Sequence, residues 1–381
     1  MWEQDVKTPL SKALETISSE CAECGLCKKE CRFLQEYGRP KQIADGFDLF
    51  NKEHQAMAYA CSLCHLCTAV CPKGLDPADM FLEMRREAVR WGLGDHPEHK
   101  RVLHYERRGA SKRYTWYGLP AGCDTIFFPG CTLTGTRPRK TLAFYQYLQR
   151  QISTAGIVLD CCTKPSHDLG RQTYFQTMFD EMKAFLVGNG VRRIVVACPN
   201  CYKIFKQYAQ EMTVTTAYEF MANDGIPSRR KTGQTVTVHD PCVLRFEDAV
   251  HLAVRQLLTK QGLTVQEMPH YGKKTFCCGE GGSAGCLAPQ FSGHWGNLRK
   301  KEVNENRTFT YCAGCANKLR ALMPTGHLLD LMFEPEKALK GKTRVSTKPP
   351  VTYLNRLWLK HRLKKTVDAS ISRERNFVAE V

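Results

Sequence analysis

The chain has 381 residues, of which 43% are hydrophobic and 24% are charged, a composition typical of a globular protein with two or three domains. Its first residues, MWEQDVKTPL, carry acids without an apolar stretch behind them, and no run of 18 apolar residues occurs, so we expect a cytoplasmic protein without signal peptide or membrane span. The formal charge of +17 does not by itself indicate nucleic acid, because it counts 20 cysteines as neutral, and so many cysteines in a reducing compartment indicate metal or redox chemistry.

Two runs of four cysteines lie near the N-terminus, and both have the spacing C-x2-C-x2-C-x3-C. This spacing is typical of paired [4Fe-4S] cubanes, in which the fourth cysteine of each run reaches the other cluster. Structural zinc is the alternative, but zinc sites usually separate two C-x2-C pairs by many residues. The expected ligands are Cys21, Cys24, Cys27 and Cys71 for one cubane, and Cys61, Cys64, Cys67 and Cys31 for the other.

The segment between the two runs predicts mostly helix, with breaks at Gly38 to Pro40 and near Gly46. We therefore expect a helical ferredoxin-like domain with two [4Fe-4S] clusters over residues 1–95. Residues 96–120 are basic and aromatic, and we interpret them as a linker across the junction with the next domain.

From residue 121 onward, short apolar runs alternate with segments of helical length, which indicates βα units and parallel sheets. The pattern occurs twice, as modules over residues 121–230 and 231–335, so the fold class is α+β and multidomain. In each module the expected strands end in one cysteine, then in two adjacent cysteines, then in C-x-x-C. The expected strands lie in TIFFPGC (125–131), GIVLDCC (156–162), RRIVVACPNC (192–201), TVTVHDPC (235–242), KKTFCC (273–278) and TFTYCAGC (308–315).

The adjacent cysteines need a particular explanation. A disulfide between neighbours is disfavoured, because their Cα atoms lie only about 3.8 Å apart. Ligands of open α/β sheets gather beyond the carboxyl ends of the strands, so five thiols of each module are expected to converge there, with both members of the pair facing one site at a strand-to-loop turn. Five thiolates exceed the four positions of tetrahedral zinc, although one could be a spectator.

This duplicated pattern, behind a dicluster module, resembles the cysteine-rich CCG modules of the heterodisulfide reductase family. The order of modules is similar to that of the fused catalytic subunit of membrane-linked heterodisulfide reductase, over roughly residues 15–330. The resemblance implies one or two noncubane [4Fe-4S] clusters, each held by the five cysteines of a module. The implied ligands are Cys131, Cys161, Cys162, Cys198 and Cys201 in the first module, and Cys242, Cys277, Cys278, Cys312 and Cys315 in the second.

The resemblance also implies an oxidoreductase of anaerobic metabolism, in which electrons pass from the cubanes to the noncubane clusters and reduce a disulfide. The alternative is an electron-transfer protein that passes electrons between a flavin dehydrogenase and a quinone or membrane partner, without a substrate of its own. The sequence contains no flavin or nicotinamide fingerprint, so either function requires a redox partner subunit, such as a flavoprotein or a membrane cytochrome or quinone protein. No nucleic-acid-binding motif is present.

Several other residues near the cysteines are candidates for smaller roles. Cys123 and Cys286 are left over, and we expect both to be small buried residues. The candidates for supplying protons are His167 and Asp168, His239 and Asp240, and Glu280, although Asp168 also resembles a helix N-cap and the His-Asp-Pro segment could merely shape a strand end.

Residues 336–381 form an expected basic C-terminal tail. Residues 337–367 contain ten Lys or Arg and no Asp or Glu. As a helix this segment would bring Arg362 and Lys365 beside Trp358, so it lacks a strongly membrane-inserting face. Two interpretations remain open, namely docking onto a partner protein and peripheral contact with anionic lipids on the cytoplasmic face of a membrane.

Overall fold

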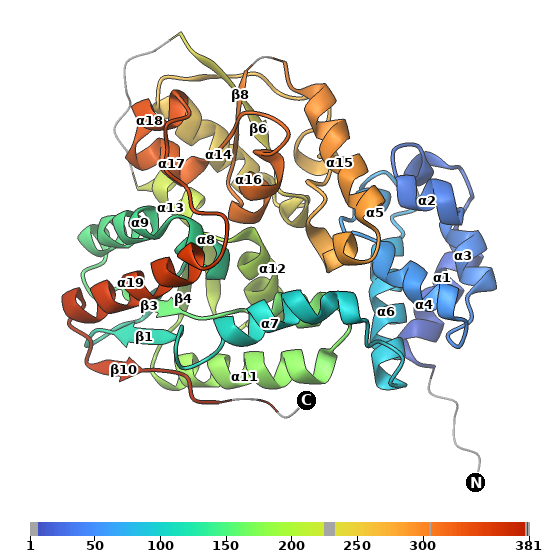
Figure 1. Cartoon of the computed structure of the whole chain (residues 1–381), viewed down its shortest axis with the longest axis horizontal. Helices are drawn as coiled ribbons and strands as arrows, with labels where there is room; N and C mark the ends of the chain where they lie inside the picture. The colour runs from blue at the N-terminus through green and yellow to red at the C-terminus, as the bar shows by residue number, and fades with distance from the viewer. Residues whose placement is uncertain (1–6, 225–232, 305, 378, 380–381) are drawn as a thin grey trace.

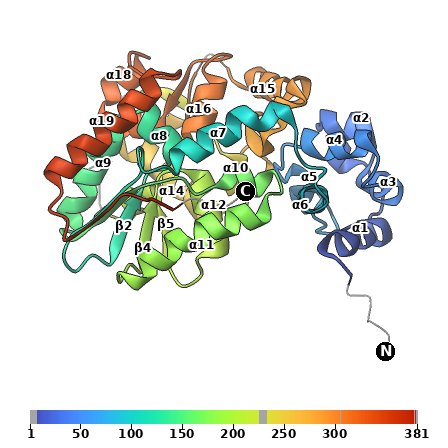
Figure 2. The same cartoon turned by 60° about the horizontal axis from the view of Figure 1, so that its bottom comes forward.

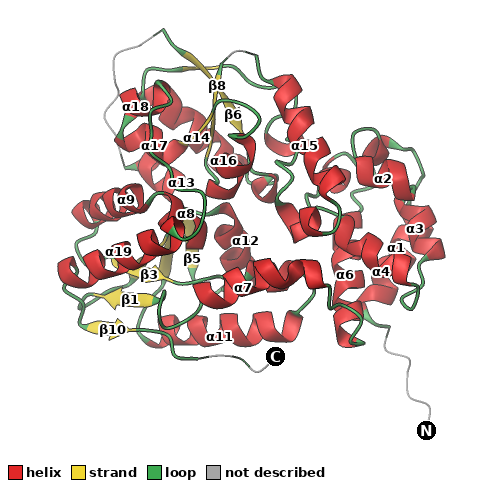
Figure 3. Ribbon diagram, viewed as in Figure 1, coloured by secondary structure: helices red, strands yellow, loops and turns green. Residues whose placement is uncertain are grey.

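The computed structural model describes residues 7–224, 233–304, 306–377 and 379 of the chain. A helical N-terminal domain lies beside two α/β modules, each built on its own sheet (Figures 1 and 3). This arrangement confirms the expected fold class. In the part of the chain that the structure describes, no helix is both long enough and apolar enough to cross a bilayer.

The N-terminal domain is helical, and its cysteine runs lie in the connections between longer helices, with Cys27 in η1 and Cys67 in α5. The expected breaks are confirmed, because α2 ends at Tyr37, α3 begins at Pro40 and α3 ends at Gly46. The apolar core of this domain also includes Phe291 of α15, which belongs to the second module. The elements are α1 (Pro9–Glu20), η1 (Leu26–Lys28), α2 (Arg32–Tyr37), α3 (Pro40–Gly46), α4 (Lys52–Ala60), α5 (Leu66–Ala69) and α6 (Pro77–Arg90).

The first module has a six-stranded sheet in the order β10-β1-β3-β2-β4-β5. Strands β3, β2, β4 and β5 are parallel, and beyond β3 the sheet continues with β1, which is antiparallel to both of its neighbours, β3 and β10. The elements are β1 (Trp116–Leu119), β2 (Thr125–Phe128), α8 (Cys131–Thr136), α9 (Pro138–Gln151), β3 (Gly156–Leu159), α10 (Lys164–Asp168), α11 (Gln172–Gly188), β4 (Arg193–Val196), α12 (Pro199–Tyr208), β5 (Thr213–Thr216), α13 (Ala217–Asn223), α19 (Val351–Thr366) and β10 (Ile371–Arg373).

The second module has a four-stranded, wholly parallel sheet in the order β7-β6-β8-β9. With β6 matched to β2, this order repeats β3-β2-β4-β5, so the tandem repeat is confirmed in the fold. One continuous apolar core runs through both modules. The elements are β6 (Thr235–His239), η3 (Cys242–Leu244), α14 (Asp248–Lys260), β7 (Thr264–Val265), η4 (Gly272–Lys274), η5 (Gly281–Cys286), α15 (Pro289–Glu302), β8 (Arg307–Thr310), α16 (Ala313–Leu319), β9 (Thr325–His327), α17 (Leu328–Phe333) and α18 (Pro335–Leu339).

One expected strand, at residues 273–278, is wrong. The matching strand is the short β7, which ends at Val265, and the chain reaches Cys277 through a loop. Gly272 has a φ of 52°, and its N–H donates to Asp240 Oδ2 at 2.8 Å. This contact turns the chain away from the sheet, so the apolar and β-branched residues that follow do not form a strand.

The expected linker and tail are both part of the folded modules. Within residues 96–120, α7 (Lys100–Gly109), which follows η2 (Pro97–His99), packs against α10 across the junction, and β1 joins the first sheet (Figures 1 and 2). The basic C-terminal segment also differs from a solvated tail. Helix α19 packs on α8 and α9 with Leu359 and Leu363 fully buried, and β10 pairs with β1. Burial of this apolar face explains why the segment folds onto the module.

Arg85 of α6 joins all three units at one point. Its side chain is fully buried. Nε donates to Ala58 O at 3.0 Å and Nη2 donates to Cys61 O at 2.5 Å, both in the N-terminal domain. Nη1 donates to Asp168 O of the first module at 2.7 Å and to Gly282 O of the second at 2.8 Å.

Candidate metal sites

The cysteines expected around the first cubane line one pocket of the N-terminal domain. Cys21, Cys24 and Cys27 border this pocket together with Cys71 from the second run, and Cys67 also touches it. Burial raises the pKa of Cys27 to about 11, and the nearby charges of Cys21, Cys24 and Cys71 contribute to the shift. The exchange of the fourth cysteine between runs is therefore compatible with the fold.

The cysteines expected around the second cubane line another pocket, bordered by Cys31, Cys61, Cys64 and Cys67. The pKa of Cys67 lies well above its usual range, because the thiol is buried beside the other three. Four thiolates so close together in an apolar pocket require a compensating cation. The donor set of this pocket thus fits a cationic iron–sulfur core.

The backbone has the same unusual turns in both runs. Glu23 and Leu63, at matched positions, have φ values of 49° and 47°. Gly25 and His65, two positions later, have φ values of 77° and 54°. Side-chain-bearing residues adopt this left-handed region rarely and at a cost, typically where the surrounding site requires it. Two loops with the same backbone conformation fit two bound cofactors of the same shape.

Five cysteines of the first module converge at the carboxyl ends of β2, β3 and β4. The Sγ atoms of Cys162 and Cys201 are 3.5 Å apart. Cys131 is hydrogen-bonded to Cys161, and Cys198 to Cys201. The structure therefore brings together all five thiols that the sequence indicated for this module.

The corresponding five cysteines of the second module also converge. The Sγ atoms of Cys242 and Cys277 are 3.7 Å apart, and Cys278 is hydrogen-bonded to both Cys277 and Cys315. The backbone N–H of Cys315 donates to Cys312 Sγ at 3.5 Å. Both modules thus offer the same five donors at matching positions. In the second module the adjacent pair lies in the loop after β7 and not directly at a strand end.

The residue after each adjacent pair explains how neighbouring thiols can face one site. Thr163 follows the first pair with a φ of 52°, and Gly279 follows the second with a φ of 90°. A left-handed residue ends the extended backbone in which neighbouring side chains would point to opposite faces. At Gly279 a Cβ atom would lie 2.1 Å from Ser292 O, so only glycine fits there.

Thiols in each module are hydrogen-bonded to one another, and their pKa values indicate whether all five could lose their protons without a bound cation. Hydrogen bonding with Cys161 lowers the pKa of Cys131, whereas that of Cys161 is raised well above its usual range. Hydrogen bonding with Cys277 and Cys315 likewise lowers the pKa of Cys278, and that of Cys315 is raised. Neither set can become fully deprotonated unless a cation binds, as iron in a cluster would.

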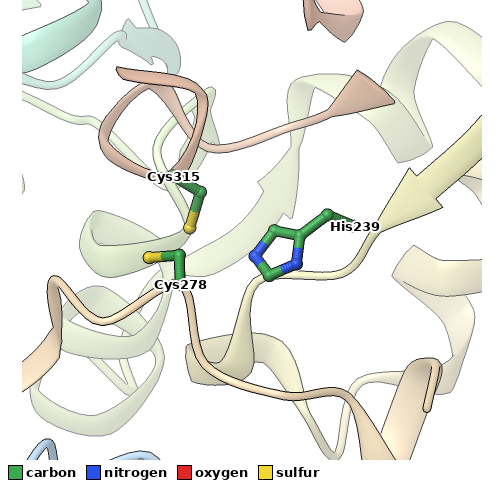
Figure 4. Close-up of side chains that lie close together, drawn as sticks. All are labelled: His239, Cys278 and Cys315. Atoms are coloured by element: carbon green, nitrogen blue, oxygen red, sulfur yellow. The ribbon is translucent and has the colours of Figure 1, made fainter. Parts of the chain in front are cut away.

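His239, at the end of β6, lies beside two of the second-module thiols. A ring nitrogen lies within 4.8 Å of the Sγ atoms of Cys278 and Cys315, and the imidazole points toward them (Figure 4). The side chain is fully buried, and neither ring nitrogen has a hydrogen-bond partner among the described residues. The matched residue of the first module is Phe128, whose ring packs on Phe205 at 5.0 Å between centroids.

The second cubane set lies directly against the second module. Burial raises the pKa of Cys64, and the charge of Cys242 adds to this shift. Hydrogen bonding with Cys278 and burial raise the pKa of Cys277, and the charge of Cys64 adds to this shift. Cys64 and Cys277 belong to one apolar cluster with Phe276 and Trp295. Among the described residues, this apolar cluster includes none from the first module.

Tyr218 of α13 connects the two modules behind their C-x-x-C turns. Its hydroxyl lies 3.0 Å from Ala197 O and 2.9 Å from Tyr311 O, within hydrogen-bonding distance of both. These carbonyl groups immediately precede Cys198 and Cys312. A single side chain therefore spans the gap between the two thiol sets.

Two buried arginines beside the thiols were missed by the sequence analysis. Arg245 is 1% exposed, donates from Nε to Cys64 O at 2.9 Å, and lies near Cys242. Arg356, from α19, is 4% exposed and helps to lower the pKa of Cys131. No sequence signal distinguishes these arginines from the exposed ones, because their burial depends on long-range packing. Each can offset negative charge on a bound cluster.

Of the proton-donor candidates, His167 and Asp168 lie in a polar network with fixed partners. His167 Nδ1 lies 2.9 Å from Asp168 Oδ1, and Nε2 lies 3.0 Å from the Tyr208 hydroxyl. Asp168 also pairs with Lys164 at 2.5 Å. The interpretation of Asp168 as an N-cap is wrong, because it is the last residue of α10 and the carboxylate is engaged in these contacts.

Asp240 and Glu280 have different surroundings. Asp240 binds Arg255 at 2.5 Å and accepts from the Tyr311 hydroxyl at 2.9 Å, so it shapes the end of β6, as the alternative interpretation proposed. Glu280 lies against Gly314 of the second C-x-x-C turn and within electrostatic reach of Cys131. The Glu280 residue is exposed, but the protein atoms packed around its carboxyl group raise its pKa.

The two remaining cysteines have different environments. Cys123 is buried, as expected, and its Sγ lies 3.3 Å from Thr125 O. Cys286 is exposed, so the expectation of a buried residue is wrong there. It ends the glycine-rich turn η5, whose small residues leave it uncovered.

Comparison with protein families matches the chain in three places. A model described as a 4Fe-4S dicluster domain matches residues 17–75, and a model described as a cysteine-rich domain matches residues 125–206 and 236–320. These matches include all the cysteines expected as ligands. The fold and the cysteine sites thus define an iron–sulfur protein with one dicluster domain and two cysteine-rich domains.

Several curated proteins match most of the chain at low identity. One component of the fumarate reductase (CoM/CoB) of Methanothermobacter marburgensis is 26% identical, over 77% of this chain and 66% of its own length. The EtfAB:quinone oxidoreductase of Syntrophomonas wolfei is 23% identical, over 80% of this chain and 46% of its own. One component of the dihydromethanophenazine:CoB–CoM heterodisulfide reductase of Methanosarcina barkeri is 22% identical, over 77% of this chain and 86% of its own length. This chain therefore spans about half to two thirds of the first two relatives.

The chain is thus similar to proteins named as subunits of heterodisulfide reductases and of a CoM/CoB fumarate reductase, and it contains one 4Fe-4S dicluster domain and two cysteine-rich domains. Among solved structures, aspartate racemase of Picrophilus torridus aligns over 62% of this chain and 99% of its own at 12% identity, with a TM-score of 0.23. That similarity is too low to bear on fold or function.

Proposed function

We propose that this chain relays electrons from two [4Fe-4S] cubanes to noncubane [4Fe-4S] clusters at which a disulfide is reduced, as one part of a larger redox complex. The observation that carries the proposal is the convergence of five thiols in both cysteine-rich modules, next to a dicluster domain. When bound, such clusters supply one-electron transfer and iron sites to which thiolate sulfur can bind. Reduction of the disulfide takes two electrons and two protons and yields two thiols.

The contacts of the cysteine sets support one order of electron transfer. Cys24 is exposed, so a cluster in the first pocket would be accessible to a donor protein. Cys64, in the second pocket, lies beside Cys242 and Cys277 of the second module. Tyr218 then leads to the first module. In this order the second module receives electrons before the first.

The described charged groups support the accumulation of negative charge at these sites. Arg245 lies beside the thiols that connect the N-terminal domain to the second module, and Arg356 lies beside Cys131. Buried cations stabilise the anionic clusters and make their reduction easier. Glu280, which lies against the second C-x-x-C turn, and the network around His167 are the candidates for proton supply.

A second candidate function is transfer of electrons between a flavin dehydrogenase and a quinone or membrane partner, without a substrate in this chain. The similarity to a protein named EtfAB:quinone oxidoreductase favours it. The partner would be a flavoprotein or a membrane cytochrome or quinone protein. The outer side of α19 is a candidate contact for such a partner or for anionic lipids, because Leu354 and Trp358 are exposed there beside Arg362.

Anaerobic purification followed by EPR distinguishes the two functions. We expect iron and acid-labile sulfide in the purified protein, and a new paramagnetic species when a thiol is added to the oxidised protein. Signals that do not respond to any thiol or disulfide would favour the second candidate function, electron transfer without a substrate in this chain. A colourless protein with zinc and no iron would contradict both functions.

Membrane contact is tested separately by co-sedimentation with vesicles that contain anionic lipid. The variant Leu354→Ala/Trp358→Ala is suited to this test because both side chains are exposed, whereas deletion of α19 would remove part of the first module. Equal sedimentation of variant and wild type would exclude contact through this face.

A further inference from the structure

We propose that His239 is a nitrogen ligand of the iron–sulfur cluster in the second module, and that the first module has no such ligand. The inference rests on the proposed function, because it assumes that the five thiols of each module hold iron. It adds a sixth protein donor to one module and makes the two clusters chemically different.

The position of His239 supports a role as a ligand. A ring nitrogen lies within 4.8 Å of Cys278 Sγ and Cys315 Sγ, and these sulfur atoms also lie within that distance of each other. Donors on one tetrahedral metal are roughly 3.5 Å apart, for metal–sulfur and metal–nitrogen bonds of about 2.3 and 2.1 Å. Only a small shift of the ring or of the thiols would bring the three donors onto one iron atom. Figure 4 shows that the ring faces Cys278 and Cys315.

The burial of His239 argues against a purely structural role. The side chain is fully buried, and neither Nδ1 nor Nε2 has a hydrogen-bond partner among the described residues. A buried polar atom without a partner costs about 1–3 kcal/mol. The neighbouring carboxylate of Asp240 is occupied by Arg255 and by the Tyr311 hydroxyl, and so does not serve the imidazole. A metal ion among the thiols would give one ring nitrogen its missing partner.

The first module lacks this feature at the matched position. Phe128 ends β2 as His239 ends β6, and its ring packs in the apolar core against Phe205. Phenylalanine offers no lone pair. A neutral imidazole adds no negative charge to a cluster, and in Rieske centres the exchange of thiolate for imidazole raises the potential. The two clusters are therefore expected to differ in their spectra as well as in their neighbours.

The test uses anaerobically purified holoprotein in which histidine is labelled with 15N. Pulsed EPR of the second-module cluster, poised in its paramagnetic state, should show a strongly coupled nitrogen that changes with the label. The variant His239→Gln should lose this coupling while the cubane signals remain. The matched control is His327→Gln, because His327 is also a fully buried histidine of the second module with an unpartnered Nε2, but it does not belong to the thiol group.

The outcomes separate this inference from the proposed function. Iron-containing wild-type protein that shows no histidine coupling, or only the weak coupling of a hydrogen-bonded nitrogen, would overturn the ligand assignment and leave the proposed function intact. Coupling that persists in His239→Gln, or that is lost in His327→Gln instead, would overturn it as well. Should His239→Gln lose the whole cluster, the labelled wild type together with the His327→Gln control still decides the assignment. Absence of iron from the wild type would overturn the proposed function itself.

Discussion

The two α/β modules have the same strand order and the same five cysteines, but their surroundings differ. The second module packs against the second cubane set through Cys64 and Cys277, and it has His239 at its first strand end. The first module has Phe128 at that position. It is extended instead by β1, α19 and β10, on the side of the sheet beyond β3.

This difference shows how a duplicated scaffold can supply two sites with separate tasks. The repeat determines the donor set, because both copies present thiols at the same strand ends. The neighbouring segments determine what each set is connected to. In our proposal the second module is the entry point for electrons and the first module is the far end of the chain of clusters.

The largest effect is expected when one thiol is removed from either module. Cys315→Ala should remove the second-module cluster and also prevent fast reduction of the first-module cluster, because the route passes through the second module. Cys201→Ala should remove the first-module cluster alone. Iron analysis and rapid-freeze EPR after mixing with a reductant would measure both effects.

The exposed Cys286 provides the control for these variants, since Cys286→Ser should retain all iron and all signals. If the first-module cluster were reduced at the wild-type rate in Cys315→Ala, the proposed order of the clusters would be incorrect.

A large effect on stability is expected at Arg85, which joins both modules to the N-terminal domain. Arg85→Met removes four hydrogen bonds to buried carbonyl groups and should reduce the free energy of unfolding by about 3–5 kcal/mol. Arg90→Met, in the same helix, removes an ion pair with Glu87 whose arginine is half exposed, and should cost at most about 1 kcal/mol. Urea unfolding measures both, and equal costs would argue against the role of Arg85 as a joint.

The C-terminal extension should stabilise the first module in particular. Leu363→Ala removes a fully buried side chain of α19 and should cost about 2–5 kcal/mol. Hydrogen–deuterium exchange should rise in the first sheet and remain unchanged in β6 and β8. Leu354→Ala, on the exposed side of the same helix, is the control and should cost less than about 0.5 kcal/mol. Increased exchange in both sheets would show that α19 supports the two modules equally.

The smallest effect is expected at Tyr218, between the modules. Tyr218→Phe removes one hydroxyl and should reduce the free energy of unfolding by about 1 kcal/mol. The loss should be accompanied by faster exchange at the amides next to Cys198 and Cys312. A stability equal to that of the wild type would mean that the hydroxyl does not join the modules.

Much of the fold was predictable because its signals are local. The helix breaks near Gly38 and Gly46 and the strands β2, β3, β4, β6 and β8 agree with the sequence patterns. The strand expected at residues 273–278 fails, because Gly272 turns under the influence of Asp240, which is distant in the sequence. The errors at Asp168 and Cys286 have local causes instead, because Asp168 ends α10 and pairs with Lys164 of the same helix, and Cys286 follows the small residues of η5.

The candidate sites likewise contain some residues that a local sequence signal identifies and others that only long-range packing brings into place. The grouping of Cys21, Cys24 and Cys27 follows from their spacing, and the convergence of five thiols in each module follows from their positions at strand ends. The resemblance added the role of these thiols as ligands of noncubane clusters, which stays a prediction. By contrast, Arg356 and Arg245 have no local signal that separates them from solvated arginines. His239 was one candidate among several for proton supply, and only its burial beside Cys278 distinguishes it.

The sequence by itself determined the cysteine sets, the repeat and the resemblance to heterodisulfide reductases, because ligand spacing and strand–helix alternation are properties of neighbouring residues. Only the tertiary structure decided which module meets the second cubane set, where the basic C-terminal segment lies and which histidine approaches the thiols. These features arise from pairings such as Tyr117 with Arg373, between segments far apart in the chain. Such contacts depend on how whole apolar faces are buried together, which no short stretch of sequence specifies.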